Sequence, residues 1–197
     1  GNVIMEVILL ERVEKLGTIG DVVRVRPGFA RNFLLPKGKA LRATDANRER
    51  FEREREDIIA RNAAEKSDAE AIKLLIDDRR YAAIRSASES GLLYGSVSTR
   101  DIADMVTEGG QRIGRSQVEL NQPIKTLGLH KIVIRLHGEV TAQIVVNVAR
   151  SEEEAELQAQ GVDVVEEARR QREDEADELA RDMAENAFKD EDGPSDD

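Results

Sequence analysis

The first part of the chain alternates between short apolar runs and turn-forming residues. Residues 7–10 are continuously apolar, which is typical of a buried strand. Residues 21–26 place two valines on one face and two arginines on the other, which predicts a half-buried strand. We expect one helical turn at 29–35, before Pro36, and a third short strand at 39–43. Because such a small domain is marginal alone, it should pack against the next segment of the chain.

The pattern changes at Thr44, and residues 45–80 predict one long helix. Thr44 is a good N-cap, and Glu, Arg, Ala and Lys, which dominate the segment, favour helix. Opposite charges four residues apart support it, at Arg48/Glu52, Glu49/Arg53, Arg50/Glu54, Arg53/Asp57 and Asp57/Arg61. Between Phe51 and Ile72 only Ile58 and Ile59 are apolar and larger than alanine. A helix that is polar nearly all round predicts an exposed spacer, and the missing seam disfavours a coiled coil.

Residues 81–150 predict a second domain of mixed type. The expected elements are a strand at 81–87, a loop or short strand at 91–95, a helix from 98 to 106 opened by a capping-box-like sequence, and a hairpin of strands 131–136 and 140–148. Residues 151–197 then form an acidic tail with few large apolar groups. We expect part of 164–188 to be a solvated helix and the rest of the tail to be disordered.

By itself, the net charge of −10 argues against a nucleic-acid partner, but its distribution reverses that conclusion. Residues 1–50 carry ten basic and six acidic side chains, whereas residues 151–197 carry five and nineteen. The acidic excess therefore lies in the last quarter of the chain. The charge of the whole chain does not exclude RNA or DNA as a partner of its first part.

Composition also limits the compartment and the chemistry. The chain has no cysteine, which removes disulfides, cysteine-zinc sites and thiol catalysis and fits a reducing compartment. No stretch approaches 18 apolar residues, and the start lacks a basic segment of a secretory signal. We therefore expect a soluble, cytoplasmic protein without a membrane partner. Met5 is typical of a natural start, so residues 1–4 are left out of the fold prediction.

The segment between Asp21 and Asp45 is the most informative for function. It contains no carboxylate, and it holds the cations Arg24, Arg26, Arg31, Lys37, Lys39 and Arg42. Phe29 and Phe33 lie among them, in a chain with few aromatic residues. Basic side chains neutralise phosphates and aromatic faces stack on unpaired bases, so the segment predicts RNA binding. The alternative is that the two phenylalanines and Leu34 fill the small core while the cations are solvated.

The remaining polar motifs give little support for catalysis. The stretch 17–20 has the wrong spacing for a phosphate-binding fingerprint, so it is either a turn between strands or an RNA contact. His130 and His137 would point to opposite faces, and a structural or surface role outweighs metal binding or catalysis. The hydroxyls of residues 96–99 are better explained by helix capping. No nucleophile, base and orienting group come together, so we expect no enzyme activity.

These residues resemble the bacterial large-subunit (50S) ribosomal protein L-nine family. Its N-terminal signature is traced here, with its spacing, by Gly17, Gly20, Val25, Gly28, Phe29, Asn32, Phe33, Leu34, Gly38, Ala40 and Thr44. The start MEVILLERVEKLG and the later stretches LLYGSVSTRDIAD and IKTLGLHKIVIRLHGEV are also similar. The resemblance runs from about Met5 to Val148. The acidic extension beyond it departs from the shorter family members, so its role is not carried over.

The resemblance implies an α+β dumbbell, in which a small three-stranded antiparallel N-domain and an α/β C-domain are joined by a long exposed helix. We expect an rRNA-binding domain at 1–44, a connecting helix at 45–80, a C-terminal α/β domain at 81–150, and an acidic, disordered or partly helical tail at 151–197. The resemblance also implies a structural constituent of the large ribosomal subunit, located in cytoplasmic ribosomes, that supports translation and reading-frame maintenance. Its partners would be the large-subunit (23S) rRNA and other large-subunit ribosomal proteins, with no cofactor, metal or small-molecule substrate.

The expected RNA-binding residues combine phosphate-neutralising cations, turn glycines and two aromatic side chains. They are Lys15, Gly17, Gly20, Arg24, Arg26, Gly28, Phe29, Arg31, Asn32, Phe33, Lys37, Gly38, Lys39 and Arg42. One alternative is a non-ribosomal RNA-binding translation or transcription factor with a helical spacer and a protein-binding C-domain. A nucleic-acid-binding barrel is disfavoured because no further barrel strands precede Thr44.

Overall fold

The computed structural model describes residues 3–191 of the 197-residue chain. Part of the segment 1–4 and the last six residues of the expected tail lie outside the described residues. In chain order the elements are β1 (Met5–Leu9), β2 (Val22–Val25), α1 (Pro27–Phe29), η1 (Ala30–Leu34), β3 (Ala40–Arg42), α2 (Asp45–Ile76), β4 (Arg80–Ile84), β5 (Leu92–Val97), α3 (Thr99–Glu108), η2 (Arg115–Gln117), β6 (Val118–Glu119), β7 (Ile124–Thr126), β8 (Gly128–His137), β9 (Val140–Ala149), α4 (Glu152–Ala159) and α5 (Val164–Glu191).

By its internal contacts the chain divides into two compact units. The first holds the chain up to Arg79 together with Thr99–Leu120 and Ile132–Ile144. The second holds Arg80–Ser98, Asn121–Lys131 and the chain from Val145 onward. These units are defined by contacts, whereas the boundaries expected after residues 44, 80 and 150 come from composition and resemblance.

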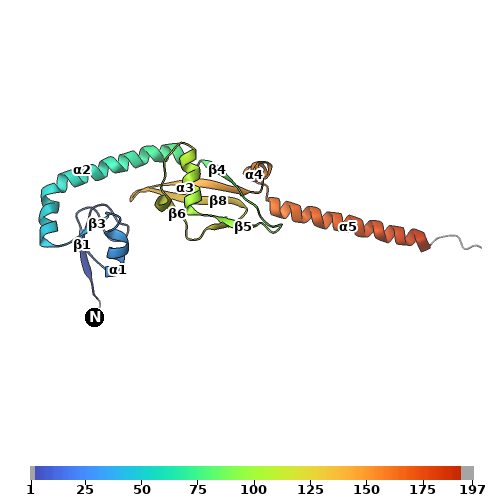
Figure 1. Ribbon diagram of the computed structural model, residues 1–197, viewed down its shortest axis with the longest axis horizontal. Coiled ribbons are helices and arrows are strands. Elements are labelled where there is room, and N and C mark those ends of the chain that lie inside the picture. Colours follow the sequence, from blue (N-terminus) through green and yellow to red (C-terminus); the bar gives the residue numbers. More distant parts are fainter. Residues whose placement is uncertain (1–2, 192–197) are drawn as a thin grey trace, which may run out of the picture. The chain divides into compact units, whose positions relative to one another are not determined.

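The first unit begins with the expected three-stranded antiparallel sheet, in the order β2-β1-β3 (Figure 1). The predicted alternation in β2 is confirmed, because Val25 is buried and Arg24 is exposed. The central strand β1 contributes Val7 and Leu9, which are both fully buried. The core of this region is formed by Val7, Leu9, Val25, Ala30, Leu34 and Ala40.

A short helical segment, α1 followed by η1, covers this small sheet. The predicted turn at 29–35 begins earlier, at Pro27, because a proline is well tolerated at the first position of a helix. η1 is a π-helical turn, and it carries the fully buried Ala30 and Leu34 on one side. Arg31 and Asn32, between these two positions, are exposed, whereas Phe33 is partly buried against the core.

Helix α2 starts where the sequence predicts. The backbone amide of Asn47 donates to the Thr44 hydroxyl oxygen at 3.1 Å, which is the expected N-cap. The helix ends at Ile76, four residues before the expected boundary, because Asp78 adopts a left-handed conformation with φ of 60°. The buried residues of α2 are Phe51, Ala69 and Ile76, so the prediction of a largely exposed helix is confirmed.

The charge pairs along α2 differ from the predicted set. Arg50 and Glu54 form the expected pair, with nitrogen and oxygen 3.4 Å apart. Arg48 does not pair with Glu52. It reaches Glu6 of β1 at 3.1 Å, because the first turn of α2 lies beside that strand. Arg55 binds Glu52 instead, at 3.2 Å.

The elements after α2 include a mixed four-stranded sheet in the order β4-β9-β8-β6. β4 pairs in parallel with β9, and such neighbours need a long connection, which residues 85–139 supply. The hairpin of β8 and β9 is confirmed, although β8 begins at Gly128 rather than residue 131. In α3, Ile102 and Val106 are fully buried. The short strands β6 and β7 were not predicted.

The start of the acidic tail is more ordered than expected. α4 occupies residues that the composition predicted to be disordered, and Ser151 caps it by accepting from the Glu154 amide at 3.2 Å. Gln158 of α4 is buried and donates to the side-chain oxygen of Asn147 on β9 at 2.7 Å. α5 agrees with the solvated helix predicted within 164–188.

Candidate RNA interface

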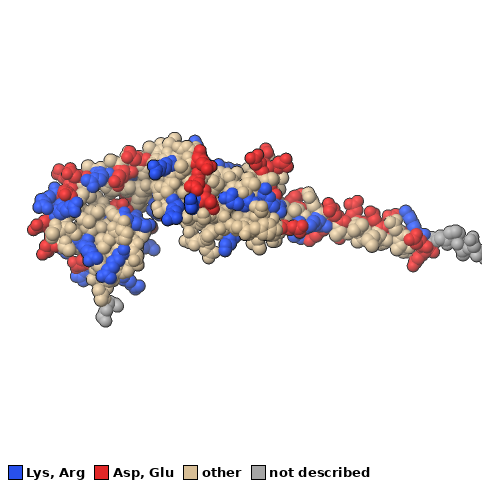
Figure 2. All heavy atoms as spheres, viewed as in Figure 1, with Lys and Arg blue, Asp and Glu red and all other residues tan. Residues whose placement is uncertain are grey.

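The α1–η1 segment positions the exposed end of the candidate interface. The Ala30 amide donates to the Arg26 carbonyl at 3.1 Å, and the Leu35 amide donates to the Ala30 carbonyl at 2.9 Å. Because Ala30 and Leu34 point into the core, Arg31 and Asn32 are exposed between them. Figure 2 shows basic side chains around this part of the molecule.

The two phenylalanines form one stacked pair with different environments. Their ring centroids are 5.2 Å apart, with an angle of 21° between the planes. Phe33 packs against the core, whereas 41% of Phe29 is exposed. The Lys37 and Lys39 ammonium groups lie 4.7 and 5.2 Å from the Phe33 centroid, which favours cation–π attraction. Phe33 therefore serves the core, as one alternative proposed, whereas the exposed ring of Phe29 is available for the other alternative, stacking on RNA.

The cations divide into compensated and uncompensated groups. Lys39 is largely buried and binds Glu11 at 2.9 Å, and Arg24 binds Glu6 at 3.2 Å. Within the expected RNA-binding set, Lys15, Arg26, Arg31 and Arg42 are exposed, and the described structure shows no hydrogen bond, ion pair or ring contact of their side chains. These four, with Lys37 and Phe29, form the part of the predicted set that is open to a partner.

The predicted glycines also serve different purposes. Gly20 has φ of 89°, and a Cβ there would lie 3.2 Å from the ring of Phe51 in α2. A Cβ on Gly17 would lie 2.6 Å from the Asp21 carboxylate, whose oxygen accepts from the Thr18 amide. Gly28 has open space and Gly38 combines open space with φ of 68°. Gly20 and Gly17 are thus required by internal packing, and Gly28 and Gly38 leave the backbone approachable.

The sequence predicted that this small domain packs against the next segment, but it did not identify the residues of α2 that make the contact. Phe51 is 2% exposed and packs on the Gly20 turn, and Arg48 shares Glu6 with Arg24. The first turns of α2 therefore belong to the same packed region as the three strands. An isolated aromatic residue in an otherwise polar helix was the signal for this contact.

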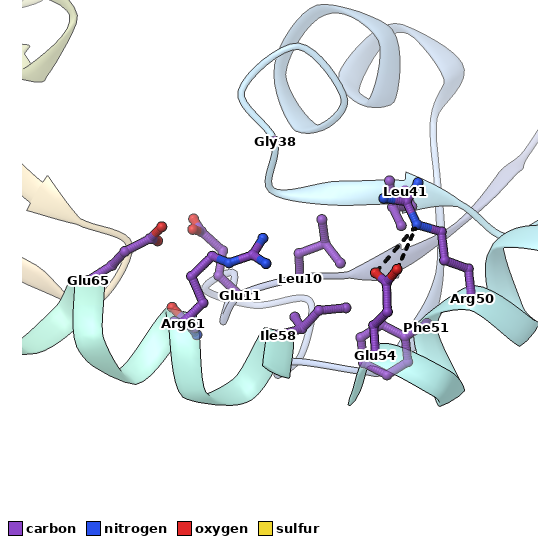
Figure 3. Close-up of a pocket in the computed structure, with 11 residues that line it drawn as sticks. Leu10, Glu11, Gly38, Leu41, Arg50, Phe51, Glu54, Ile58, Arg61 and Glu65 are labelled. Carbon is purple, nitrogen blue, oxygen red and sulfur yellow. Dashed lines mark hydrogen bonds and ion pairs between the residues drawn. The ribbon is translucent and has the colours of Figure 1, made fainter. Parts of the chain in front are cut away.

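A pocket of about 200 Å³ lies between the sheet and α2 (Figure 3). Leu10 and Leu41 face Phe51 and Ile58 across it, and the Arg50–Glu54 pair lies at its rim. Ligand pockets usually measure about 300–1,000 Å³. The pocket is better described as a gap between helix and sheet than as a substrate site.

The two histidines are both engaged in local hydrogen bonds. Nδ1 of His137 accepts from the Glu139 amide at 3.1 Å, which leaves Nε2 to donate to the Asn62 side-chain oxygen at 2.7 Å. Nε2 of His130 lies 2.9 Å from the Thr126 carbonyl oxygen. Within residues 3–191, no cluster of three or more potential metal-binding side chains occurs. In the same range, no helix has both the length and the apolar character of a membrane span.

Comparison with protein families gives two matches along the chain. Residues 5–51 match the N-terminal domain of ribosomal protein L9. Residues 67–150 match the C-terminal domain of the same protein. The first match covers the three strands and the start of α2, and the second covers the end of α2 through β9.

Curated relatives are similar over most of their own length. The large ribosomal subunit protein bL9 of Chelativorans sp. (strain BNC1) is 59% identical over 157 residues, which is 80% of each chain. That of Maricaulis maris (strain MCS10) is 58% identical over 161 residues, covering 82% of this chain and 77% of the relative. Identity of this extent, together with both domain matches and the three-stranded sheet followed by a long exposed helix, shows that the chain belongs to the bL9 family of large ribosomal subunit proteins.

Proposed function

We propose that the chain is a structural constituent of the large ribosomal subunit that binds the large-subunit rRNA through its first 44 residues. The observations that carry this proposal are the exposed cations of these residues that have no partner in the described structure, together with the exposed ring of Phe29. In the proposed organisation, residues 45–80 connect this domain to the C-terminal domain at 81–150, and the acidic tail occupies 151–197. The relatives are named as large-subunit proteins, and we propose no catalytic role.

The proposed mechanism is phosphate neutralisation by a preformed surface. Arg26 precedes the helical segment and Arg31 lies within it, and their guanidinium groups are free to replace counterions at the RNA backbone. The exposed face of Phe29 can stack on a base or pack on a sugar. Open space at Gly28 lets an RNA backbone approach closely.

Two members of the expected set have a different role in this proposal. Lys39 neutralises Glu11 and packs beside Phe33, and Gly20 accommodates Phe51. They shape the surface and do not themselves need to touch RNA. Lys15, with φ of 68°, projects from the turn that precedes Gly17 and remains a proposed phosphate contact.

The test is binding of the full chain to large-subunit rRNA over a salt series from about 50 to about 200 mM. The double variant Arg26→Gln/Arg31→Gln should lower affinity and reduce the slope of log K against log salt by about two, one for each phosphate contact. Arg53→Gln/Arg55→Gln, on α2, removes the same charge outside the interface and should leave the slope nearly unchanged. Equal effects of both double variants would contradict a localised interface.

The alternative is a non-ribosomal RNA-binding factor. Sedimentation distinguishes the two: a subunit constituent co-sediments with large subunits and leaves them at high salt. Co-sedimentation only with free RNA would favour the alternative. A contribution to reading-frame maintenance is tested with a frameshift reporter in cells that carry the chain without residues 81–150, where we expect a higher error rate than with the full chain.

A further inference from the structure

Helix α5 (Val164–Glu191) is a feature that the proposed RNA interface does not use. It lies after residue 150, where the match to the C-terminal family domain ends. Figure 1 shows it as one uninterrupted helix. Every residue from Arg169 to Glu191 is exposed, so no described part of the chain covers this stretch of the helix.

The base of α5 is firmly built into the second unit. Val164 is buried, and Val165 packs so closely on Gly91 that a Cβ there would lie 2.8 Å from it. The guanidinium of Arg80 donates to the Ala159 carbonyl at 3.1 Å, at the end of α4. The helix is therefore presented from a fixed base rather than joined through a loose linker.

One face of α5 carries an apolar stripe. It consists of Ala176, Leu179, Ala180, Met183 and Ala187, whose spacings of three and four residues place them on one side of a helix. Leu179 is 60% exposed and Met183 is 64% exposed. Phe188 comes nine residues, or two and a half turns, after Leu179, so it projects from the opposite side.

The charge beside the stripe is acidic and uncompensated. Arg169 binds Glu166 and Glu173, and this pairing lowers the pKa of Glu166 mainly through the hydrogen bond from Arg169. Residues 174–191 carry eight acidic and two basic side chains, and no ion pair forms among them in the described structure. Figure 2 shows acidic side chains beside uncharged ones along this helix. Like charges three and four residues apart destabilise a helix, so a basic partner would relieve this repulsion.

We propose that the stripe of α5 is a docking site for a Lys- and Arg-rich protein surface with an apolar groove. On the proposed function, that surface belongs to a neighbour within the large subunit. RNA is disfavoured because its phosphates repel the acidic flanks, and a second copy of α5 would bring like charges together. In the proposed fit, Leu179 and Met183 enter the apolar groove, and the acidic residues around them face the basic side chains of the partner.

The first test uses the isolated full chain and a fluorescent synthetic helix of leucine and lysine as the probe. Leu179→Ser/Met183→Ser should weaken binding by about tenfold or more, because two apolar anchors are lost. The matched control Phe188→Ser, on the opposite side, should have little effect. A probe with serine in place of leucine should bind weakly and ignore both variants. Equal binding of the two probes, or equal effects of the two variants, would overturn the proposal.

The second test uses large subunits that have incorporated the chain. A photoreactive benzoylphenylalanine at Met183 should cross-link to a protein segment rich in lysine and arginine, and the same group at Glu185 should not. Cross-links to RNA or to a second copy would overturn the assignment of the occupant. Failure to co-sediment would instead contradict the proposed ribosomal function, and the peptide test, which needs no ribosome, would still decide on the stripe.

Discussion

At the scale of single residues, side chains of the same class, basic or aromatic, perform different tasks in different surroundings. Lys39 is largely buried against Glu11, whereas Arg26 extends into solvent without a partner in the described structure. Phe33 packs against the core, whereas Phe29 stacks on the ring of Phe33. Local surroundings therefore decide which members of a basic, aromatic segment are free to bind.

Gly20→Ala should destabilise the first unit by about 1–3 kcal/mol. The added methyl group meets the Phe51 ring, and φ of 89° is unfavourable for residues with a Cβ. The measurement is amide hydrogen exchange of β1, whose protection should fall. Gly28→Ala is the control, because its Cβ meets open space. Equal loss of protection in both variants would contradict the packing role of Gly20.

Gln158→Ala should destabilise the packing of α4 by about 1–3 kcal/mol, since the side-chain oxygen of the buried Asn147 loses its donor. The Gln158 amide also donates to the Val148 carbonyl at 2.9 Å. Exchange of the β9 amides reports the effect. The exposed Gln160→Ala variant should behave like the parent chain, and an equal response would show that the network contributes nothing.

At the scale of elements, α2 and α5 are both long and exposed but are supported differently. α2 is N-capped by Thr44 and held at its start by Phe51 and Arg48. α5 is held at its base by Val164 and Val165, and its far half carries unpaired acidic charge. The start of α2 is therefore fixed by contacts with the three-stranded sheet and its turns. The far half of α5 makes no such contact in the described structure, and its apolar stripe is exposed.

Thr44→Ala should cost about 1 kcal/mol of local helix stability, because the Asn47 amide loses its acceptor. Amide exchange at the first turn of α2 should accelerate while its centre is unchanged. Ser67→Ala, at an exposed interior position, should be neutral or slightly stabilising. Faster exchange along the whole helix would instead indicate that the cap controls global stability.

At the scale of the whole molecule, charge is segregated along the chain. The first 50 residues have a net charge of +4, and residues 151–197 have a net charge of −14. An acidic arm lowers the attraction of the whole chain for any polyanion at low salt. Segregation therefore keeps the acidic tail apart in sequence from the basic first 50 residues, where RNA binding is proposed.

Ending the chain at Arg172 removes twelve acidic and two basic residues and makes the remainder formally neutral. The shortened chain keeps the packed base of α5, so its fold should be unchanged. Its affinity for a non-specific RNA such as poly(U) should rise several-fold at about 50 mM salt and approach that of the full chain at high salt. Binding that is equal at low salt would show that the tail does not act through its charge.

The sequence by itself determined the order and kind of the main elements. Alternation in residues 21–26, the Thr44 cap and the polar composition of α2 depend on neighbours along the chain, so they are readable without a structure. The carboxylate-free segment likewise identified where RNA binding is proposed. In contrast, α4 was mistaken for disorder, because it is held by the hydrogen bond between Gln158 and the buried Asn147 of β9, which its acidic composition does not indicate.

Only the tertiary structure decided which basic residues of the first part of the chain are available to bind RNA. The pairing of Arg48 with Glu6, of Lys39 with Glu11, and the contact of Gly20 with Phe51 join residues 28 to 42 positions apart. Such contacts depend on how strands and helices pack, and the local periodicity of the sequence does not predict them. The sequence thus located a basic surface, and packing separated the cations that stabilise the fold from those left free to meet a phosphate.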